Sequence, residues 1–418
     1  MDHFNVRDGV LHAEAVPLTS IAEAVGTPVY VYSRATLERH AKVFRDALAA
    51  IPSFEIAFAV KANPNLAVLG VLSRLGYGAD VVSGGELARA LAAGIKPGRI
   101  IFSGVGKLRS EMADALGAGI GQFNIESEEE GAELSQAAIE AGGRADCALR
   151  VNPDVDAATH AKISTGTAGT KFGVAASRVR RVYARLAALP GLRLRGLAVH
   201  IGSQMRSLEP LESALLRIGD LVEALRVDGF DITHVDVGGG LGVPYVPGEL
   251  LPSPAQYGQL VASVTRDWNT RLIFEPGRVI AGNAGVLLTR VIRVKDAEPE
   301  PFVIVDAAMN DLARPALYDA YHHFEPVVER SGSMTANIAG PVCETGDTFA
   351  RSRSISPVRA DDLAVFRTAG AYGATMASTY NSRDLVPEVL VDGERFAVVA
   401  DRIPALTVMA AERVPEWV

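Results

Sequence analysis

The stretch that decides the fold is EIAFAVKANPN, residues 55–65. Its first part is almost entirely apolar, and Ile56 and Phe58 favour an extended strand. The run ends at Lys61, and Pro64 then breaks the pattern. This stretch therefore predicts a buried strand that leads directly into a charged residue and a turn.

Seven further β-rich apolar runs follow this one along the chain. They are ADVVS (79–83), RIIFS (99–103), GQFNI (121–125), ADCALRVN (145–152), LRGLAVHI (194–201), THVDVG (233–238) and RLIFE (271–275). Segments with helical periodicity lie between them, such as GELARALAAG (85–94) and EEEGAELSQAAIEAG (128–142). Ser127 and Glu130 are spaced as a capping box at the start of the second helix. Eight strand–helix units in about 220 residues predict a TIM-type (β/α)₈ barrel.

A doubly wound open sheet is the structural alternative. Such a sheet usually carries a glycine fingerprint after its first strand, where a dinucleotide binds. Here the first strand is followed by Lys61, Ala62, Asn63 and Pro64, and GGGLG (238–242) does not match GxGxxG. The barrel is therefore the favoured prediction.

After Arg278 the pattern changes to strands separated by turn residues. Examples are VLLTRVIRV (286–294), PFVIVDA (301–307) and PEVLVDGERFAVVA (387–400). The N-terminal residues through TPVYVYS (27–33) also look extended. We predict a barrel over residues 34–280, and a β-sandwich or β-barrel domain formed by residues 281–418 together with residues 1–33.

Composition restricts the class of protein. The chain has 418 residues, a net charge of −8 and 48 % hydrophobic residues, which is typical of a globular protein and unfavourable for nucleic-acid binding. The first residues lack a signal-peptide pattern, and no apolar run is long enough for a membrane helix. Cys147 and Cys343 are the two cysteines, too few for a disulfide framework or a zinc site. We expect a cytoplasmic protein without a metal.

Polar residues gather where the predicted strands end. Because the active site of such barrels lies at the carboxyl ends of the strands, these residues are expected to converge. They are Lys61, Arg150, Asn152, His200, Gly202, Ser203, Gly238, Gly239, Gly240, Glu275, Gly277 and Arg278. Each has an ordinary structural alternative: a solvated lysine, a hydrogen-bonded core histidine, a tight glycine turn, or a glutamate paired with an arginine.

Taken together, these residue types suit pyridoxal 5'-phosphate. The loops after strands 7 and 8 of such barrels often bind phosphate, and Arg278 adds positive charge there. An amine such as that of Lys61 can form an imine with an aldehyde. A carboxylate such as that of Glu275 can keep a pyridine nitrogen protonated. An imidazole such as that of His200 can stack on the ring.

Eight motifs resemble those of the diaminopimelate decarboxylase family, in the same order and over nearly the whole chain. They are FAVKANPN (58–65), DVVSGGEL (80–87), HIGSQ (200–204), DVGGGLG (236–242), EPGR (275–278), NDLARPALY (310–318), PVCETGD (341–347) and GAYGATMAS (370–378). That family has a barrel and a β domain, like the alanine-racemase-like enzymes to which it belongs.

The resemblance implies a role for each matching residue. Lys61 would hold the cofactor as a Schiff base, and Glu275 would pair with its ring nitrogen. The remaining cofactor-binding residues would be Asp80, Arg150, His200, Ser203, Gly239, Gly240, Gly277, Arg278 and Tyr372. The substrate would be meso-diaminopimelate, bound by Arg278, Arg314, Tyr318, Glu344 and Tyr372. Cys343 would donate a proton to the reacting carbon, and Cys343 and Glu344 would reach the neighbouring site of a homodimer.

The sequence also distinguishes among related activities. A carboxylate at the ring nitrogen favours decarboxylation over racemisation, because it maintains a strong electron sink. Arg314 and Glu344 suit a substrate whose far end carries both a carboxylate and an ammonium. Decarboxylation of D-ornithine, D-lysine or a carrier-bound amino acid stays open, as does a non-catalytic regulator that binds the cofactor. Pro64 and the segment HAKISTGTAGTKFG (160–173) depart from the family pattern.

Overall fold

The computed structural model describes residues 2–156, 165–167 and 169–418. Residues 157–164 and 168, which include part of the segment that departs from the family pattern, lie outside this description. The chain forms two compact units. One comprises Glu38–Val243 and Leu250–Ile280, and the other comprises Met1–Leu37, Pro244–Glu249 and Ala281–Val418. The short segment 244–249, expected within the barrel, groups with the second unit.

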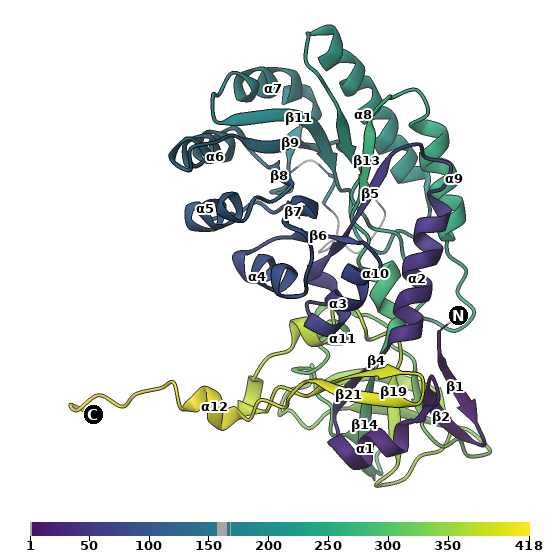
Figure 1. The fold of residues 1–418 in the computed structure, drawn as a ribbon. Helices are drawn as coiled ribbons and strands as arrows, with labels where there is room; N and C mark the ends of the chain where they lie inside the picture. Colours follow the sequence, from purple (N-terminus) through teal and green to yellow (C-terminus); the bar gives the residue numbers. More distant parts are fainter. Residues whose placement is uncertain (1, 157–164, 168) are drawn as a thin grey trace. The chain divides into compact units, whose positions relative to one another are not determined.

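The first unit is a closed barrel of eight parallel strands (Figure 1). In chain order these are β5 (Phe54–Ala59), β6 (Gly78–Val81), β7 (Ile100–Phe102), β8 (Gln122–Ile125), β9 (Ala145–Asn152), β11 (Leu192–Val199), β12 (His234–Asp236) and β13 (Arg271–Phe274). The register Ile273↔Glu55 between β13 and β5 closes the barrel. All eight predicted strands are present, so the predicted (β/α)₈ fold is confirmed. A two-residue strand, β10 (Val174–Ala175), pairs with β9 as an addition.

Helices lie around the outside of these strands (Figure 1). They are α2 (Arg34–Ala47), α3 (Leu66–Arg74), α4 (Gly84–Ala92), α5 (Arg109–Ala118), α6 (Glu128–Glu140), α7 (Val179–Ala187), α8 (Glu209–Val227) and α9 (Pro254–Val264). A short helix, α10 (Arg278–Ala281), follows β13. Ser127 caps α6 by accepting the Glu130 N–H at 3.1 Å. The Glu130 carboxylate accepts from Lys107 at 2.7 Å, so the predicted capping box forms only in one direction.

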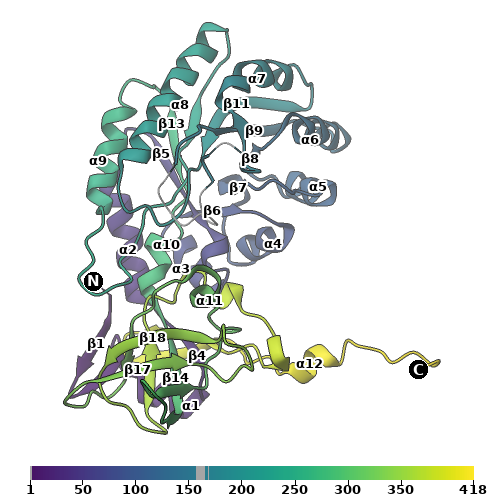
Figure 2. The ribbon, with the colours of Figure 1, turned by 180° about the vertical axis from the view of Figure 1, so that it is seen from behind.

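The second unit is built mainly from one large sheet, seen from behind in Figure 2. Its strands are β4 (Val29–Ser33), β14 (Gly285–Lys295), β15 (Phe302–Val305), β16 (Phe324–Pro326), β17 (Met334–Ala339), β18 (Thr348–Ile355), β19 (Leu363–Phe366), β20 (Glu388–Asp392) and β21 (Arg395–Ala400). The N-terminal strand β4 is buried along its whole length and lies between β14 and β20. The predicted joining of the N-terminal segment to this domain is therefore confirmed.

The sequence predicted an extended N-terminal segment, but part of this segment is helical. After a small sheet of β1 (Phe4–Arg7), β2 (Val10–Ala13) and β3 (Val16–Pro17), residues Leu18–Val25 form helix α1. Leu18, Ile21 and Ala22 are its buried positions, which is the spacing of one helix face. The chain also forms two short helices, α11 (Arg314–Tyr318) and α12 (Ala405–Met409). Across the described ranges, no helix combines the length and the hydrophobicity required to cross a lipid bilayer.

Candidate active site

Lys61 lies in a 3₁₀ turn, Val60–Ala62, directly after β5. Its Nζ is 3.1 Å from Oδ2 of Asp80, which is completely buried on β6. The other oxygen of Asp80, Oδ1, has no hydrogen-bond partner among the residues that the structure describes. The Lys61 side chain stays 37 % exposed. An accessible amine beside an incompletely satisfied buried carboxylate is a reactive arrangement rather than a closed structural ion pair.

Two more carboxyl groups lie inside the mouth of the barrel. Asp236 on β12 accepts from Asn124 Nδ2 at 2.9 Å and from Gly238 N at 2.9 Å. Burial, followed by the charges of Asp236 and Asp80, raises the pKa of Glu275 well above its usual range. Burial likewise raises the pKa of Asp236. Two such neighbouring groups resist being ionised together, so a positive charge placed here would be strongly stabilised.

The glycine loop after β12 passes very close to its neighbours. A Cβ at Gly239 would lie 2.2 Å from the Glu275 carbonyl oxygen, and one at Gly240 would lie 2.3 Å from the Gly202 carbonyl oxygen. Only glycine permits these approaches, and Gly240 also has a φ of +107°. The loops after β11, β12 and β13 are thereby brought together, as phosphate-binding barrels require.

Arg278 and Ser203 meet beside this glycine loop. Nη2 of Arg278 donates to Oγ of Ser203 at 3.1 Å. Arg278 begins the short helix α10 and is only 6 % exposed. A buried cation next to a hydroxyl and to glycine backbone is suited to an anion such as a phosphate.

His200 directly follows β11, and its ring is oriented by the glycine loop. Nδ1 accepts the N–H of Gly239 at 3.3 Å. Burial, with smaller contributions from Lys61 and Arg150, lowers the pKa of His200 well below its usual range. The imidazole is therefore neutral near pH 7, which suits packing against a ring better than carrying a charge.

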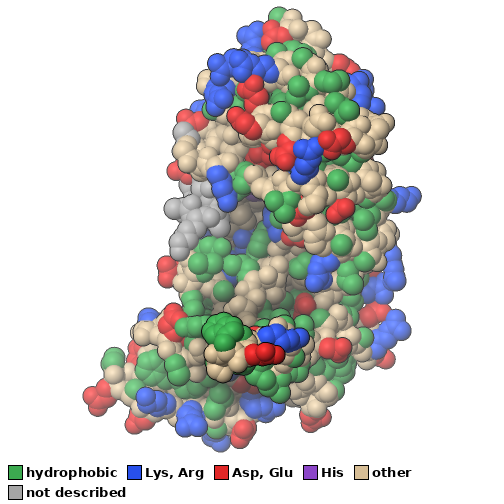
Figure 3. Space-filling view, turned by 90° about the vertical axis from the view of Figure 1, so that its left-hand side faces the viewer, with side chains coloured by type: hydrophobic (Ala, Val, Ile, Leu, Met, Phe, Trp, Pro, Cys, Tyr) green, Lys and Arg blue, Asp and Glu red, His purple; other side chains and the backbone are tan. Residues whose placement is uncertain are grey.

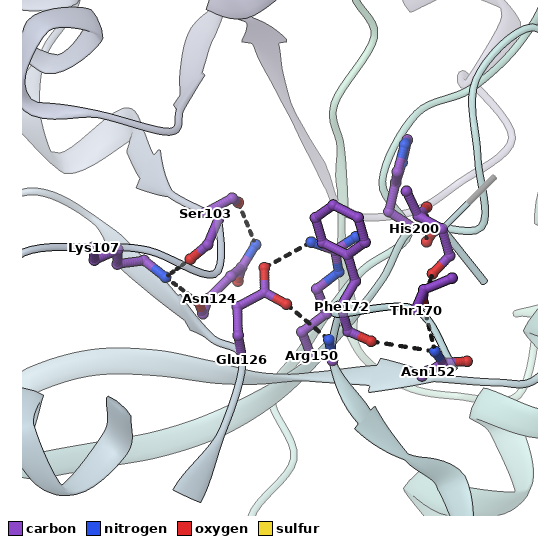
Figure 4. Close-up of polar contacts among 12 residues, drawn as sticks. Ser103, Lys107, Asn124, Glu126, Arg150, Asn152, Thr170, Phe172 and His200 are labelled. Atoms are coloured by element: carbon purple, nitrogen blue, oxygen red, sulfur yellow. Dashed lines mark hydrogen bonds and ion pairs between the residues drawn. The ribbon is translucent and has the colours of Figure 1, made fainter. Parts of the chain in front are cut away.

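Arg150, on β9, is held by a network that the sequence did not reveal (Figure 4). Its Nη1 donates to Oε1 of Glu126 at 2.7 Å, and its guanidinium lies 4.8 Å from the centre of the Phe172 ring. Oε2 of Glu126 accepts the N–H of Gly173 at 2.9 Å. One carboxylate thus fixes both the arginine and the segment that carries Phe172.

A buried lysine, Lys107, is linked to this network by hydrogen bonds. Nζ of Lys107 donates to the carbonyl oxygen of Asn124 at 2.7 Å (Figure 4). It also donates to the carbonyl oxygen of Gly104 and to Oε1 of Glu130, each at 2.7 Å. Oε2 of Glu130 in turn accepts from the N–H of Glu126. Glu126 directly follows β8, so the rule that polar residues gather at strand ends could have identified it.

The structure places Asp80, Arg150, His200, Ser203, Gly239, Gly240, Glu275, Gly277 and Arg278 at the carboxyl ends of the barrel strands or in the loops that follow them, together with Lys61. Asn124 and Asp236 are additional polar residues of this mouth that the sequence analysis did not select. Asn124 stands inside β8, where a polar residue is easily mistaken for an outward-facing one, whereas Asp236 is the last residue of β12 and the strand-end pattern could have identified it.

The remaining predicted residues belong to the second unit. Cys343 is exposed, and the adjacent Glu344 accepts from Tyr380 Oη at 2.8 Å. Arg314 is buried at the start of α11, and Tyr318 ends the same helix. Tyr372 has a φ of +56°, an uncommon backbone conformation for a tyrosine. Asp347 holds the Cys343 loop by accepting from Val342 N at 2.7 Å and from Met309 N at 2.6 Å.

Comparison with known proteins gives a consistent result. The family described as pyridoxal-dependent decarboxylase, pyridoxal binding domain, matches residues 34–282. A diaminopimelate decarboxylase of Zymomonas mobilis is 52 % identical over 417 residues, covering 99 % of each chain. One of Vibrio cholerae is 49 % identical over 417 residues, again with 99 % of each chain covered.

Solved structures agree with these sequence relatives. The crystal structure of diaminopimelate decarboxylase from M. jannaschii in complex with L-lysine has a TM-score of 0.95 at 32 % identity, covering 99 % of this chain and 98 % of that one. The enzyme from Helicobacter pylori, also complexed with L-lysine, has a TM-score of 0.90 at 35 % identity, covering 94 % and 98 %.

Proposed function

This chain belongs to the diaminopimelate decarboxylase family of pyridoxal-dependent decarboxylases, and we propose that it converts meso-2,6-diaminopimelate to L-lysine and CO₂, the last step of lysine biosynthesis. Its cofactor is pyridoxal 5'-phosphate. The observation that carries the proposal is the mouth of the barrel. There the amine of Lys61 lies 3.1 Å from Asp80, and the charges of both residues act on the buried carboxyl group of Glu275.

The residues of this mouth fit the cofactor. When bound, pyridoxal phosphate supplies a ring that accepts the electron pair released as CO₂ departs. Lys61 is the amine for its aldehyde group. Burial raises the pKa of Glu275, so its carboxyl group holds a proton that a pyridine nitrogen could share, and the resulting pyridinium would stabilise the carboxylate. Neutral His200 suits the ring face. Asp80, Arg150 and Tyr372 complete the proposed cofactor site.

The phosphate is assigned to the glycine loop and its surroundings. Ser203, Gly239, Gly240, Gly277 and Arg278 are the residues proposed to hold it. Backbone N–H groups from glycines can approach an anion closely, and the buried Arg278 guanidinium adds charge-assisted hydrogen bonds.

We propose that the two charged groups at the far end of the substrate are bound by side chains of complementary charge and by hydroxyl groups. Arg278, Arg314 and Tyr318 would bind the distal carboxylate, Glu344 would bind the distal ammonium, and Tyr372 would contact the substrate. Cys343 would deliver the proton that replaces the carboxyl group. The proximity of Tyr380 to Glu344, with its Oη donating at 2.8 Å, supports a fixed orientation for this carboxylate.

We also propose a homodimer in which Cys343 and Glu344 of one copy complete the site of the other. Both residues are exposed within their own unit. The C-terminal segment adds support, because Leu406, Met409, Val414 and Trp417 are exposed hydrophobic residues, and hydrophobic side chains also gather on the face seen in Figure 3. The free state of Cys147 and Cys343 favours a reducing compartment, so we expect the protein in the cytoplasm.

The direct test measures CO₂ release by the purified protein with pyridoxal phosphate and meso-diaminopimelate. The expected product is L-lysine, identified by mass and chirality. Lys61→Ala should abolish the reaction and the visible absorbance of the lysine-bound cofactor, whereas Lys96→Ala, at an exposed position, should change neither. Release of CO₂ only from D-ornithine, D-lysine or a carrier-bound amino acid would contradict the assigned substrate. Absorbance without turnover of any of these would favour a regulator.

A further inference from the structure

The buried guanidinium of Arg314 is held by a histidine. Its Nη1 lies 2.9 Å from Nε2 of His322. The other ring nitrogen of His322, Nδ1, lies 2.9 Å from the carbonyl oxygen of Arg367. Arg314 is 6 % exposed and His322 is 1 % exposed, so water competes little for these hydrogen bonds.

The partners of His322 fix its protonation state. A carbonyl oxygen can only accept a hydrogen bond, so Nδ1 must carry the proton. A guanidinium can only donate, so Nε2 must be without one. His322 is therefore a neutral imidazole with its proton on Nδ1. A second proton, on Nε2, would point at a cation and break the contact with Arg314.

The sheet determines where the imidazole stands. His322 and His323 immediately precede β16, and Arg367 immediately follows β19, its antiparallel partner. The N–H of Arg367 donates to the carbonyl oxygen of His323 at 2.8 Å, which extends the ladder by one step. The carbonyl oxygen of His322 accepts from Arg353 at 2.6 Å. The pairing of β16 with β19 thus fixes the position of the His322 ring, and the hydrogen bond from Arg314 to this ring fixes the position of the guanidinium.

Tyr245 covers both groups. The Arg314 guanidinium carbon is 4.6 Å from the centre of the Tyr245 ring. The same ring meets the His322 imidazole edge-on, with centroids 5.3 Å apart and planes at 82°. Arg314 is therefore constrained by a hydrogen bond and by a ring face, and both constraints come from residues of its own unit.

We propose that His322 is a positioning residue for Arg314, and that through it His322 determines selectivity for a substrate with a distal carboxylate. The inference rests on the proposed function, which assigns that carboxylate to Arg314. A guanidinium recognises a carboxylate best when its plane is fixed in advance, because two parallel hydrogen bonds need a defined orientation. His322 supplies this orientation without contacting the substrate.

Two substitutions separate the functions of the two ring nitrogens. In His322→Asn, the side-chain amide can replace the Nδ1 donor, but the shorter side chain has no acceptor that reaches Arg314. In His322→Gln, the longer side chain places its amide oxygen near the position of Nε2, where it can accept from Arg314. We expect the asparagine variant to raise KM for meso-diaminopimelate about ten-fold or more, with kcat changed less than about three-fold. The glutamine variant should keep KM within about three-fold of wild type.

The matched control is His323→Asn, the same change one residue further along the chain. The His323 ring is 30 % exposed and lies 3.6 Å from Glu325, so its loss should leave KM unchanged. In an Arg314→Ala background, His322→Asn should have no further effect on KM, because the two residues act as one. Equal losses for asparagine and glutamine, a fall in kcat with unchanged KM, or additive effects with Arg314→Ala would each overturn the proposal.

A second measurement is independent of turnover. Nitrogen-15 NMR of the holoenzyme, with the His322 signals assigned by comparison with His322→Gln, should show a neutral ring protonated on Nδ1. A ring protonated on Nε2, or a charged ring near pH 7, would overturn the inference even if decarboxylation is confirmed. Conversely, wild-type protein without activity on diaminopimelate would contradict the proposed function, and the NMR result would still decide whether His322 holds Arg314.

Discussion

Glu86 shows how local burial changes the chemistry of a single residue. It is the third residue of α4, and one of its oxygens accepts the N–H of Val82 at 2.8 Å. Burial raises the pKa of Glu86 to about 7, with Asp80 contributing in the same direction. In sequence it looks like an ordinary first-turn glutamate, and nothing in its neighbours along the chain predicts this shift.

The shifted pKa of Glu86 predicts a pH dependence of stability. A carboxyl group whose pKa is higher in the folded state takes up a proton on folding. Its contribution to the stability of the folded state is therefore fully present below the unfolded-state pKa of 4.5 and is lost as the pH rises through the folded-state pKa of about 7. Glu86→Gln cannot ionise but can still accept from Val82. Raising the pH from 5 to 8 should lower the free energy of unfolding of both proteins. The decrease should be about 1–2 kcal/mol smaller for Glu86→Gln than for the wild type.

Urea unfolding at the two pH values measures this difference. Glu133→Gln, an exposed change on α6, serves as the control and should follow the wild type. Parallel pH profiles for Glu86→Gln and wild type would show that Glu86 does not titrate in this range.

At the scale of elements, strand ends were predictable and the contacts between them were not. The eight barrel strands follow from runs of β-branched and aromatic residues. Lys61, His200 and Glu275 stand out only together, because the carboxyl ends of all eight strands meet at one mouth of the barrel. The ion pair of Arg150 with Glu126 joins neighbouring strands, and sequence spacing contains no information on that register. Helix α1 was missed because its eight residues are too few for a clear helical period to emerge.

The glycine loop after β12 gives a prediction at this scale. In Gly239→Ala, the added methyl group would meet the Glu275 backbone at 2.2 Å, and backbone cannot move aside as a flexible side chain can. We expect the free energy of unfolding to fall by about 1–3 kcal/mol, together with faster loss of pyridoxal phosphate on dialysis.

Gly117→Ala is the matched control for this substitution. Gly117 lies within α5, and an added Cβ there would meet nothing within 4 Å. Alanine should stabilise this helix by about 0.5–1 kcal/mol and leave cofactor retention unchanged. If Gly239→Ala behaved in the same way, the close approach of the loops would have no functional importance.

For the whole molecule, the proposed homodimer with shared sites predicts complementation between inactive copies. Suppose one copy carries Lys61→Ala and the other Cys343→Ala. Each hybrid dimer then has one site with both residues intact and one site lacking both. Purified hybrids with distinct affinity tags should show about half of the wild-type activity per dimer.

The two parent variants, each purified alone, provide the baseline for that experiment. Hybrid activity no higher than the better parent would mean that Cys343 acts within its own subunit, or not at all. A mixture of Lys61→Ala with Lys61→Ala carrying the second tag should remain inactive and controls for the tags themselves.

Strand β4 has a consequence for how the chain is made. This strand is synthesised among the first 33 residues, yet its neighbours β14 and β20 appear only at residues 285–295 and 388–392. During translation the largely apolar strand β4 therefore has no β-strand partner until the ribosome has produced the entire barrel. The barrel can close once residue 274 has emerged, whereas the second unit cannot complete its sheet until the chain is nearly finished. We therefore expect the delayed pairing of this strand to leave a newly made chain open to aggregation and to chaperone binding until synthesis is nearly complete.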